Sequence, residues 1–237
     1  MTTSGTFAFN LDLNDIIEEA YERCGVEVRT GYEHRTARRS LNLLTIEWAS
    51  RGINLWTIEQ GAISLVPGQI EYDLPVDTID LLEHVIRTGT GQNQTDINIT
   101  RISVSTYSTI PNKNTTGRPI QVWVDRQSGA TTPTGVNPPK IYVWPAPDNS
   151  IPYTFYYWRL KRIADSGGGI NTQGIPFRFL PCLIAGLAYY LSMKIPDAMN
   201  RMQMLKAEYE QQWMIASDED REKAAIRLAP RDTFYNS

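Results

Sequence analysis

The sequence is poor in the residues that bind metals or form disulfides. Its 237 residues include two cysteines and two histidines. Cys24 and Cys182 are far apart and lack metal-type spacing, so we expect two reduced thiols in a protein made in the cytosol. His34 and His84 have no cysteine or second histidine at ligand spacing, so no metal site is expected.

Long hydrophobic runs and an excess of positive charge are also missing. The longest apolar run, residues 179–191, is too short to span a bilayer and predicts a buried helix. The N-terminus lacks the basic and apolar segments of a signal peptide. The formal net charge of -3 argues against a protein that grips nucleic acid through its phosphates, although a channel wall past which DNA slides remains compatible.

Sequence motifs of enzyme chemistry are absent too. There is no G-x-S-x-G element and no phosphate-binding loop. Asp73, Asp77, Asp80 and Glu83 are of the right type for a glycosidase pair, but solvated carboxylates at strand ends and turns are the simpler interpretation. We therefore do not expect an enzyme.

The N-terminal residues carry two helical patterns. Apolar residues recur at helical spacing between Leu13 and Cys24, and Gly25 should end that helix. A second helix is predicted over residues 33–50. Its polar face carries Arg35, Arg38 and Arg39, which either form a solvated face or contact a neighbouring subunit or passing DNA.

The middle of the chain, from about residue 56 to residue 162, has the patterns of β-strands. Residues 62–66 and 69–73 are predicted as strands joined by a tight turn at Pro67 and Gly68. Residues 153–160 are apolar on both faces, as expected of a central strand. Polar segments at residues 88–96, 111–117 and 128–139 are predicted to be surface loops.

Helical patterns return near the C-terminus. A buried helix is predicted around residues 181–193, broken by Pro196, and a last long helix is predicted to begin near Asp197. The whole order predicts an α+β fold, in which the N- and C-terminal helix pairs form a four-helix domain with an inserted antiparallel β-rich domain. The expected boundaries are residues 1–55 and 170–225 for the discontinuous helical domain, 56–169 for the β-rich domain and 226–237 for a C-terminal arm.

A series of short segments, in this order along the chain, resembles one protein family. The segments are LDLNDIIEEAYERCG at 11–25, TARRSLNLL at 36–44, EWASRGINLW at 47–56, LVPGQIEYDLP at 65–75, IPNKNTTGRP at 110–119 and VWPAP at 143–147. The series is similar to the head-to-tail adaptors of short-tailed bacteriophages (podoviruses), also called tail accessory factors or tail tubular proteins. The likeness extends from about Asn10 to about Ile215.

The resemblance implies a structural virion protein of the neck, assembled in the host cytoplasm. It implies a helical and a β-rich domain, no cofactor, and a ring, expected to be dodecameric, between the portal protein and the tail nozzle protein. Double-stranded DNA would pass through the bore during packaging and ejection without sequence-specific binding.

The resemblance also suggests a role for the C-terminal arm, since this segment reaches toward the portal in similar proteins. Leu228, Phe234 and Tyr235 would then be apolar anchors for portal docking. A frayed terminus is the alternative interpretation. Two other functions stay open for the whole chain, namely another minor tail or baseplate protein, or a tail-associated peptidoglycan hydrolase.

Overall fold

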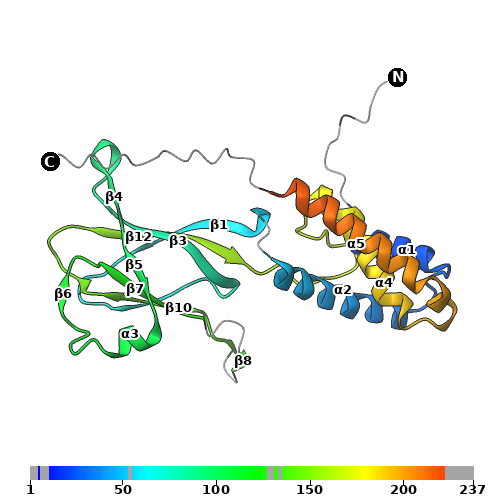
Figure 1. Ribbon diagram of the computed structural model, residues 1–237, viewed down its shortest axis with the longest axis horizontal. Helices are drawn as coiled ribbons and strands as arrows, with labels where there is room; N and C mark the ends of the chain where they lie inside the picture. Colours follow the sequence, from blue (N-terminus) through cyan, green and yellow to red (C-terminus); the bar gives the residue numbers. More distant parts are fainter. Residues whose placement is uncertain (1–4, 6–10, 53–54, 127–130, 133–134, 222–237) are drawn as a thin grey trace, which may run out of the picture.

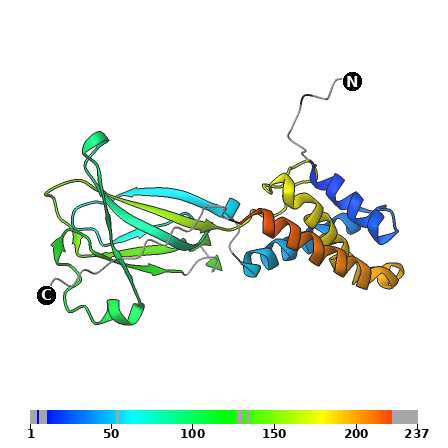
Figure 2. The same ribbon diagram turned by 45° about the horizontal axis from the view of Figure 1, so that its top comes forward.

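The computed structural model describes residues 5, 11–52, 55–126, 131, 132 and 135–221. Figure 1 shows two parts next to each other along the longest axis, one made of helices and the other mainly of strands. The same separation is visible in Figure 2. The predicted α+β class is confirmed.

The first two helices begin and end where capping chemistry places them. Helix α1 spans Leu13–Cys24 and helix α2 spans Gly31–Arg51. Asp12 and Thr30 are their N-caps, and each forms a capping box with the acidic residue three positions on. Gly25 ends α1 with φ 82°, a left-handed conformation that glycine adopts without strain. The predicted second helix was therefore right to within two residues.

The two C-terminal helices are α4, Leu180–Ser192, and α5, Met202–Glu219. A short 3-10 helix, η3 (Phe177–Phe179), precedes α4. The prediction that the last helix begins near residue 197 was wrong by five residues, because Pro196–Arg201 form the 3-10 helix η4. Pro196 lacks the N–H that a continuing α-helix would need, so the chain changes direction there.

One hydrophobic core is shared by α1, α2, α4 and α5. Helix α4 contacts all of the other three. Trp48 lies at the centre, 5.7 Å from the ring of Phe179 and 5.3 Å from that of Trp213, and its Nε1 donates to Tyr209 Oη at 3.0 Å. A Cβ on Gly186 would lie 2.9 Å from Leu44 and Tyr209 atoms, so this glycine lets α4 approach both α2 and α5 closely.

The β part contains two four-stranded sheets. The first has the order β1-β12-β3-β4, and all its neighbours are antiparallel. Its strands are β1 (Ile58–Ser64), β12 (Tyr153–Lys161), β3 (Thr78–Thr88) and β4 (Thr95–Asn98). Strand β12 lies between β1 and β3, as its apolar sequence predicted.

The second sheet has the order β2-β10-β7-β5. Its strands are β2 (Glu71–Asp73), β10 (Lys140–Trp144), β7 (Gln121–Asp125) and β5 (Thr100–Ile102). Within this sheet β5 and β7 are parallel, whereas β10 pairs antiparallel with both β2 and β7, so the sheet is not purely antiparallel. The two sheets enclose a second core that includes Ile86 and Phe155 from the first sheet and Val122, Ile141 and Val143 from the second.

Short elements complete the β part. Helix α3 is Val104–Ser108, and the 3-10 helices η1 and η2 are Leu55–Thr57 and Gly91–Asn93. Two small strand pairs are also present. They are β6 (Thr116–Gly117) with β11 (Ala146–Pro147), which are parallel, and β8 (Thr131–Thr132) with β9 (Gly135–Val136).

The predicted turn at Pro67 and Gly68 is present. Gln69 N donates to Val66 O at 3.1 Å, and Gly68 has φ 79°. The strands on either side do not pair with each other, however, because β1 pairs with β12 and β2 with β10. The turn carries the chain from one sheet to the other.

Candidate interaction surfaces

The two thiols are buried in the helical core. Cys24 Sγ lies 3.3 Å from Ala188 O, and burial raises the pKa of this thiol to about 11. Burial raises the pKa of the Cys182 thiol to about 12. Both groups stay protonated at neutral pH, so neither has the character of a nucleophile or a metal ligand.

The two histidines lie in different parts of the molecule. His84 is on β3, where its ring stacks on Phe155 at 5.9 Å. Burial, and then the positive charge of Arg101, lowers the pKa of His84, so its ring is neutral. His34 is in the first turn of α2, near Arg38. No group of three metal-ligating side chains was found among the residues that the structure describes.

Two of the acidic residues considered for glycosidase chemistry, Asp77 and Asp80, bind arginines, and Asp73 lies 3.6 Å from Lys140. Arg159, whose side chain is 8% exposed, bonds Asp77 Oδ1 at 2.5 Å and Glu59 Oε2 at 2.7 Å. Arg159 lowers the pKa of Asp77, whereas a general acid needs a raised pKa. Asp80 lies between two further arginines, 2.8 Å from Arg101 and 3.0 Å from Arg126. The arrangement holds strands together and does not resemble a catalytic pair.

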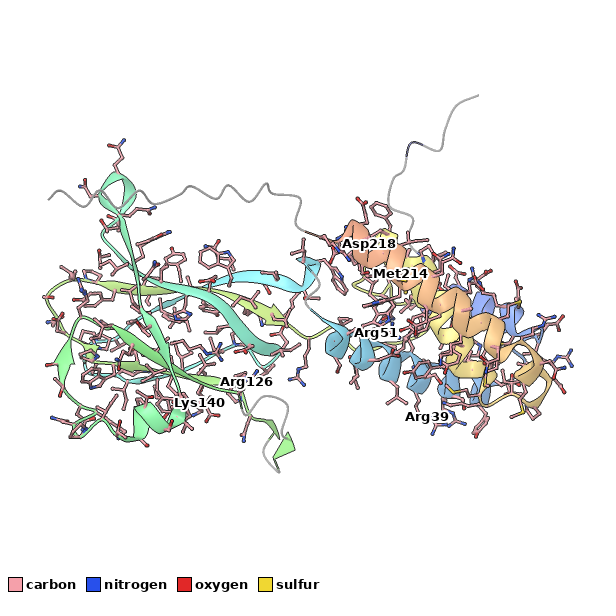
Figure 3. All side chains as sticks on the ribbon, viewed as in Figure 1. Arg39, Arg51, Arg126, Lys140, Met214 and Asp218 are labelled. Carbon is pink, nitrogen blue, oxygen red and sulfur yellow. The ribbon has the colours of Figure 1, made fainter. Side chains whose placement is uncertain are left out.

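At the C-terminal end of α2, a polar cluster joins this helix to α5. Arg51 bonds Glu47 and Glu210, and its guanidinium lies 4.8 Å from the ring centre of Tyr209 and 5.0 Å from that of Trp213. Figure 3 labels Arg51 at this junction between the helices. The cluster holds one side of α2 against one side of α5. The opposite side of each of these two helices faces outward.

The outward flank of α2 carries the predicted arginines Arg35 and Arg39. We call this surface the α2 face. Its exposed residues are Tyr32, Arg35, Arg39, Leu43, Ile46 and Ser50, at successive helical turns.

Arg38 points to one side of the α2 face, where its Nη1 donates to Gly167 O at 3.2 Å. With Arg35, Arg39, Asn42 and others it lines a shallow groove of about 520 Å³. Within the described residues, no carboxylate pairs with any of the three arginines. The positive charge of this groove is therefore not neutralised locally.

The outward flank of α5 is a second exposed surface, which we call the α5 face. Its residues are Met204, Ala207, Gln211, Met214, Ile215 and Asp218. Met214 is 63% exposed and Ile215 is 57% exposed, values similar to the 54% of Leu43 and 63% of Ile46 on the α2 face. Sequence reasoning missed these aliphatic residues, although their helical spacing away from the buried stripe could have revealed them.

A larger groove of about 840 Å³ lies at the tip of the helical part. It is formed by the end of α1, the start of α2 and the end of α4, and it is lined by both acidic and basic residues.

In the β part, Tyr107, Trp123 and Tyr142 form a cluster of rings with centroids 4.7 to 5.7 Å apart. The helical tip is hollowed, whereas the aromatic cluster is a packed surface.

Two other predictions concern the C-terminal docking residues and membrane-spanning helices. The expected docking residues Leu228, Phe234 and Tyr235 lie outside the described residues. None of the helices in the described part of the chain has the length and apolar character needed to cross a membrane.

Comparison with protein families gives a match over most of the chain. No curated protein matches the chain. A family model described as SU10 adaptor protein matches residues 11–231, which include both hydrophobic cores. The prediction of a phage head-to-tail adaptor is thus confirmed, whereas its assignment to short-tailed phages stays a prediction. Such an adaptor is a structural component at the head-tail junction of a phage particle, where it contacts other head or tail proteins. The chain belongs to the SU10 adaptor protein family.

Proposed function

We propose that the chain is one subunit of a ring that joins the portal vertex of a short-tailed phage to its tail nozzle and continues the DNA channel. The match of an adaptor family over residues 11–231 is the observation that carries this proposal. The exposed aliphatic residues on two helices support it, because large apolar side chains left in contact with water commonly mark protein interfaces. The ring is dodecameric and is assembled in the host cytoplasm.

The two cores correspond to two domains in this proposal. Residues 1–55 and 170–225 form a four-helix domain, and residues 56–169 form a β-rich domain inserted into it. The separation of the two hydrophobic clusters supports this division, since among the described residues no buried one belongs to both. Each domain then presents its own surface to the neighbouring proteins of the neck, which are the portal protein and the tail nozzle protein.

Arg35, Arg38 and Arg39 contact either an adjacent subunit or passing DNA. Their lack of a described carboxylate partner supports such a role, because unpaired guanidinium groups can bind phosphates or the acids of another chain. DNA would be contacted through its backbone only, without readout of sequence.

The C-terminal arm, residues 226–237, docks on the portal through Leu228, Phe234 and Tyr235. Alternation of these apolar residues with charged ones supports the idea of a docking peptide. This proposal separates a portal-binding adaptor from another minor tail or baseplate protein, which would not bind a portal.

The test is co-purification of the full chain with the portal protein of the same phage, followed by electron microscopy. We expect a ring on the portal with the intact chain. Changing Leu228, Phe234 and Tyr235 together to Ala should abolish capture, and changing Arg231 and Asp232 to Ala is the matched control that should retain it. Absence of any complex between the intact chain and the portal would overturn the proposed function.

A further inference from the structure

The helical part has two exposed apolar surfaces on different sides. Figure 3 shows Arg39, on the α2 face, at the lower side of the helices, and Met214 and Asp218, on the α5 face, at the upper side. Both faces contain aliphatic side chains that are more than half exposed. One contact between two copies of the chain can cover one face of each.

The two helices carry opposite charge. Helix α2 contains four arginines and two glutamates, whereas α5 contains four carboxylates and one lysine. Three of these carboxylates already bind arginines of the same chain, Glu208 with Arg23, Glu210 with Arg51 and Asp218 with Arg221. A second copy therefore offers the basic α2 face a helix whose formal charges sum to a negative value, with Asp218 on its exposed flank. Two α2 faces, or two α5 faces, would instead bring like charges together.

The directions of the helices suit a cyclic arrangement. Helices α2 and α5 both run from the tip of the molecule toward the β part (Figure 1, Figure 2). Rotation by the small angle between neighbours in a large ring keeps α2 of one copy nearly parallel to α5 of the next. Nearly parallel helices pack well through side chains spaced three and four residues apart, which is the spacing of both faces.

We propose that the α2 face of each copy packs against the α5 face of the next copy around the ring. Leu43 and Ile46 of one subunit contact the aliphatic residues Met214 and Ile215 of its neighbour, and Arg35 and Arg39 lie along the acidic helix. The contact is heterologous, so it continues from copy to copy until the ring closes. This inference rests on the proposed function and identifies the surfaces through which ring subunits meet.

Crosslinking of a cysteine pair tests the contact in the full chain bound to the portal. The variant carries Ile46→Cys and Met214→Cys and is treated with a short bismaleimide. Because both native thiols are buried, the reagent should react only with the two introduced thiols. We expect a ladder of covalent species from dimer to the full ring, and the pair Ile46→Cys with Ile215→Cys should give a similar ladder.

Two controls define the geometry of the contact. A mixture of the two single variants should give no species larger than a dimer, because each copy then offers one thiol. The pair Val104→Cys with Ile120→Cys uses exposed positions in the β part and should give no ladder.

The possible failures can be told apart. If rings form on the portal but the 46 and 214 pair gives no ladder, the proposed contact is wrong and the adaptor function stands. Dimers formed by Ile46→Cys alone, or crosslinks from position 46 to the portal, would also overturn the contact. If the chain forms no ring at all, the contact and the proposed function fall together.

Discussion

Arginines are used differently in the β part and on the outer side of α2. In the β part, Arg87, Arg101 and Arg159 each bind a carboxylate within 2.8 Å. On the α2 face, neither Arg35 nor Arg39 has a carboxylate partner in the described chain. The difference indicates that charge in the β part stabilises the subunit, whereas charge on α2 is available to another molecule.

The helical core can be tested first, since it should show the largest effect. Trp48→Ala removes a fully buried side chain that contacts two rings and Tyr209. We expect the free energy of unfolding to fall by about 3–5 kcal/mol in urea denaturation. Ile46→Ala, two residues away and exposed, should change it by no more than about 0.5 kcal/mol. If the two variants lowered the free energy of unfolding equally, the stability of the helical core would not depend on the packing of Trp48.

The second test removes the most buried arginine of the β part. Arg159→Met leaves Asp77 and Glu59 without their shared partner, but these carboxylates are about half exposed and can regain water. We expect a loss of about 1–3 kcal/mol in the free energy of unfolding. Arg126→Met is the control, because Arg126 is 59% exposed and should contribute at most about 1 kcal/mol. A larger loss from the control would reverse this ranking.

Acid should affect the β part more than the helical part, because a lowered pKa is found for four carboxyls in the described β part and for two, Glu33 and Glu210, in the described helical part. Lys140, Arg159 and Arg87 lower the pKa values of Glu71, Asp77 and Asp96 respectively. A carboxyl whose pKa is lower in the folded state stabilises the fold above its unfolded pKa, and this stabilisation is lost as the pH falls through the folded pKa.

This linkage predicts faster amide hydrogen exchange in β3 and β12 when the pH is lowered from 7 to 3, after correction for the intrinsic exchange rate. Protection in α4, which contains no aspartate or glutamate, should fall less. A uniform loss of protection would show that the two parts unfold together in acid. Arg159→Met should reduce the pH dependence of the β part.

The smallest effect on stability is expected on the α2 face. Arg39→Ala should change the free energy of unfolding by no more than about 0.5 kcal/mol, because within the described residues Arg39 bonds only Thr36 Oγ1, at 3.3 Å. It should nevertheless reduce the fraction of rings seen by mass photometry with portal. Arg29→Ala, an exposed arginine outside the α2 face, is the matched control and should leave ring formation unchanged. An equal effect of the two substitutions would mean that general charge matters and the face does not.

Local sequence signals predicted the helices well and the sheets only in part. Capping residues and helical spacing act within a few positions, so the bounds of α1 and α2 followed from the sequence. Strand partners are chosen over long distances, as when Ile58 pairs with Leu160. The pattern around Pro67 and Gly68 predicted a turn, but it contained no information about the separate partners of β1 and β2.

The candidate surfaces were predictable to a similar degree. Arg35 and Arg39 stood out because three arginines cluster in a short segment. Leu43 and Ile46 did not, because apolar residues in a helix are ordinarily assigned to its core, and exposure depends on which neighbours pack against each flank. The tertiary arrangement of α4 and α5 was needed to show that this flank of α2 remains uncovered.

The ladder between β1 and β12 has a mechanical consequence. Strand β1 starts just after the chain leaves the helical part, β12 ends just before it returns, and Ile58 lies opposite Leu160 at this end. Tension applied between the helical part and the β part would pull both strands in the same direction, so it would not peel them from each other. The load would pass instead into the hydrogen bonds between β12 and β3, which would be sheared together and would therefore resist rupture collectively.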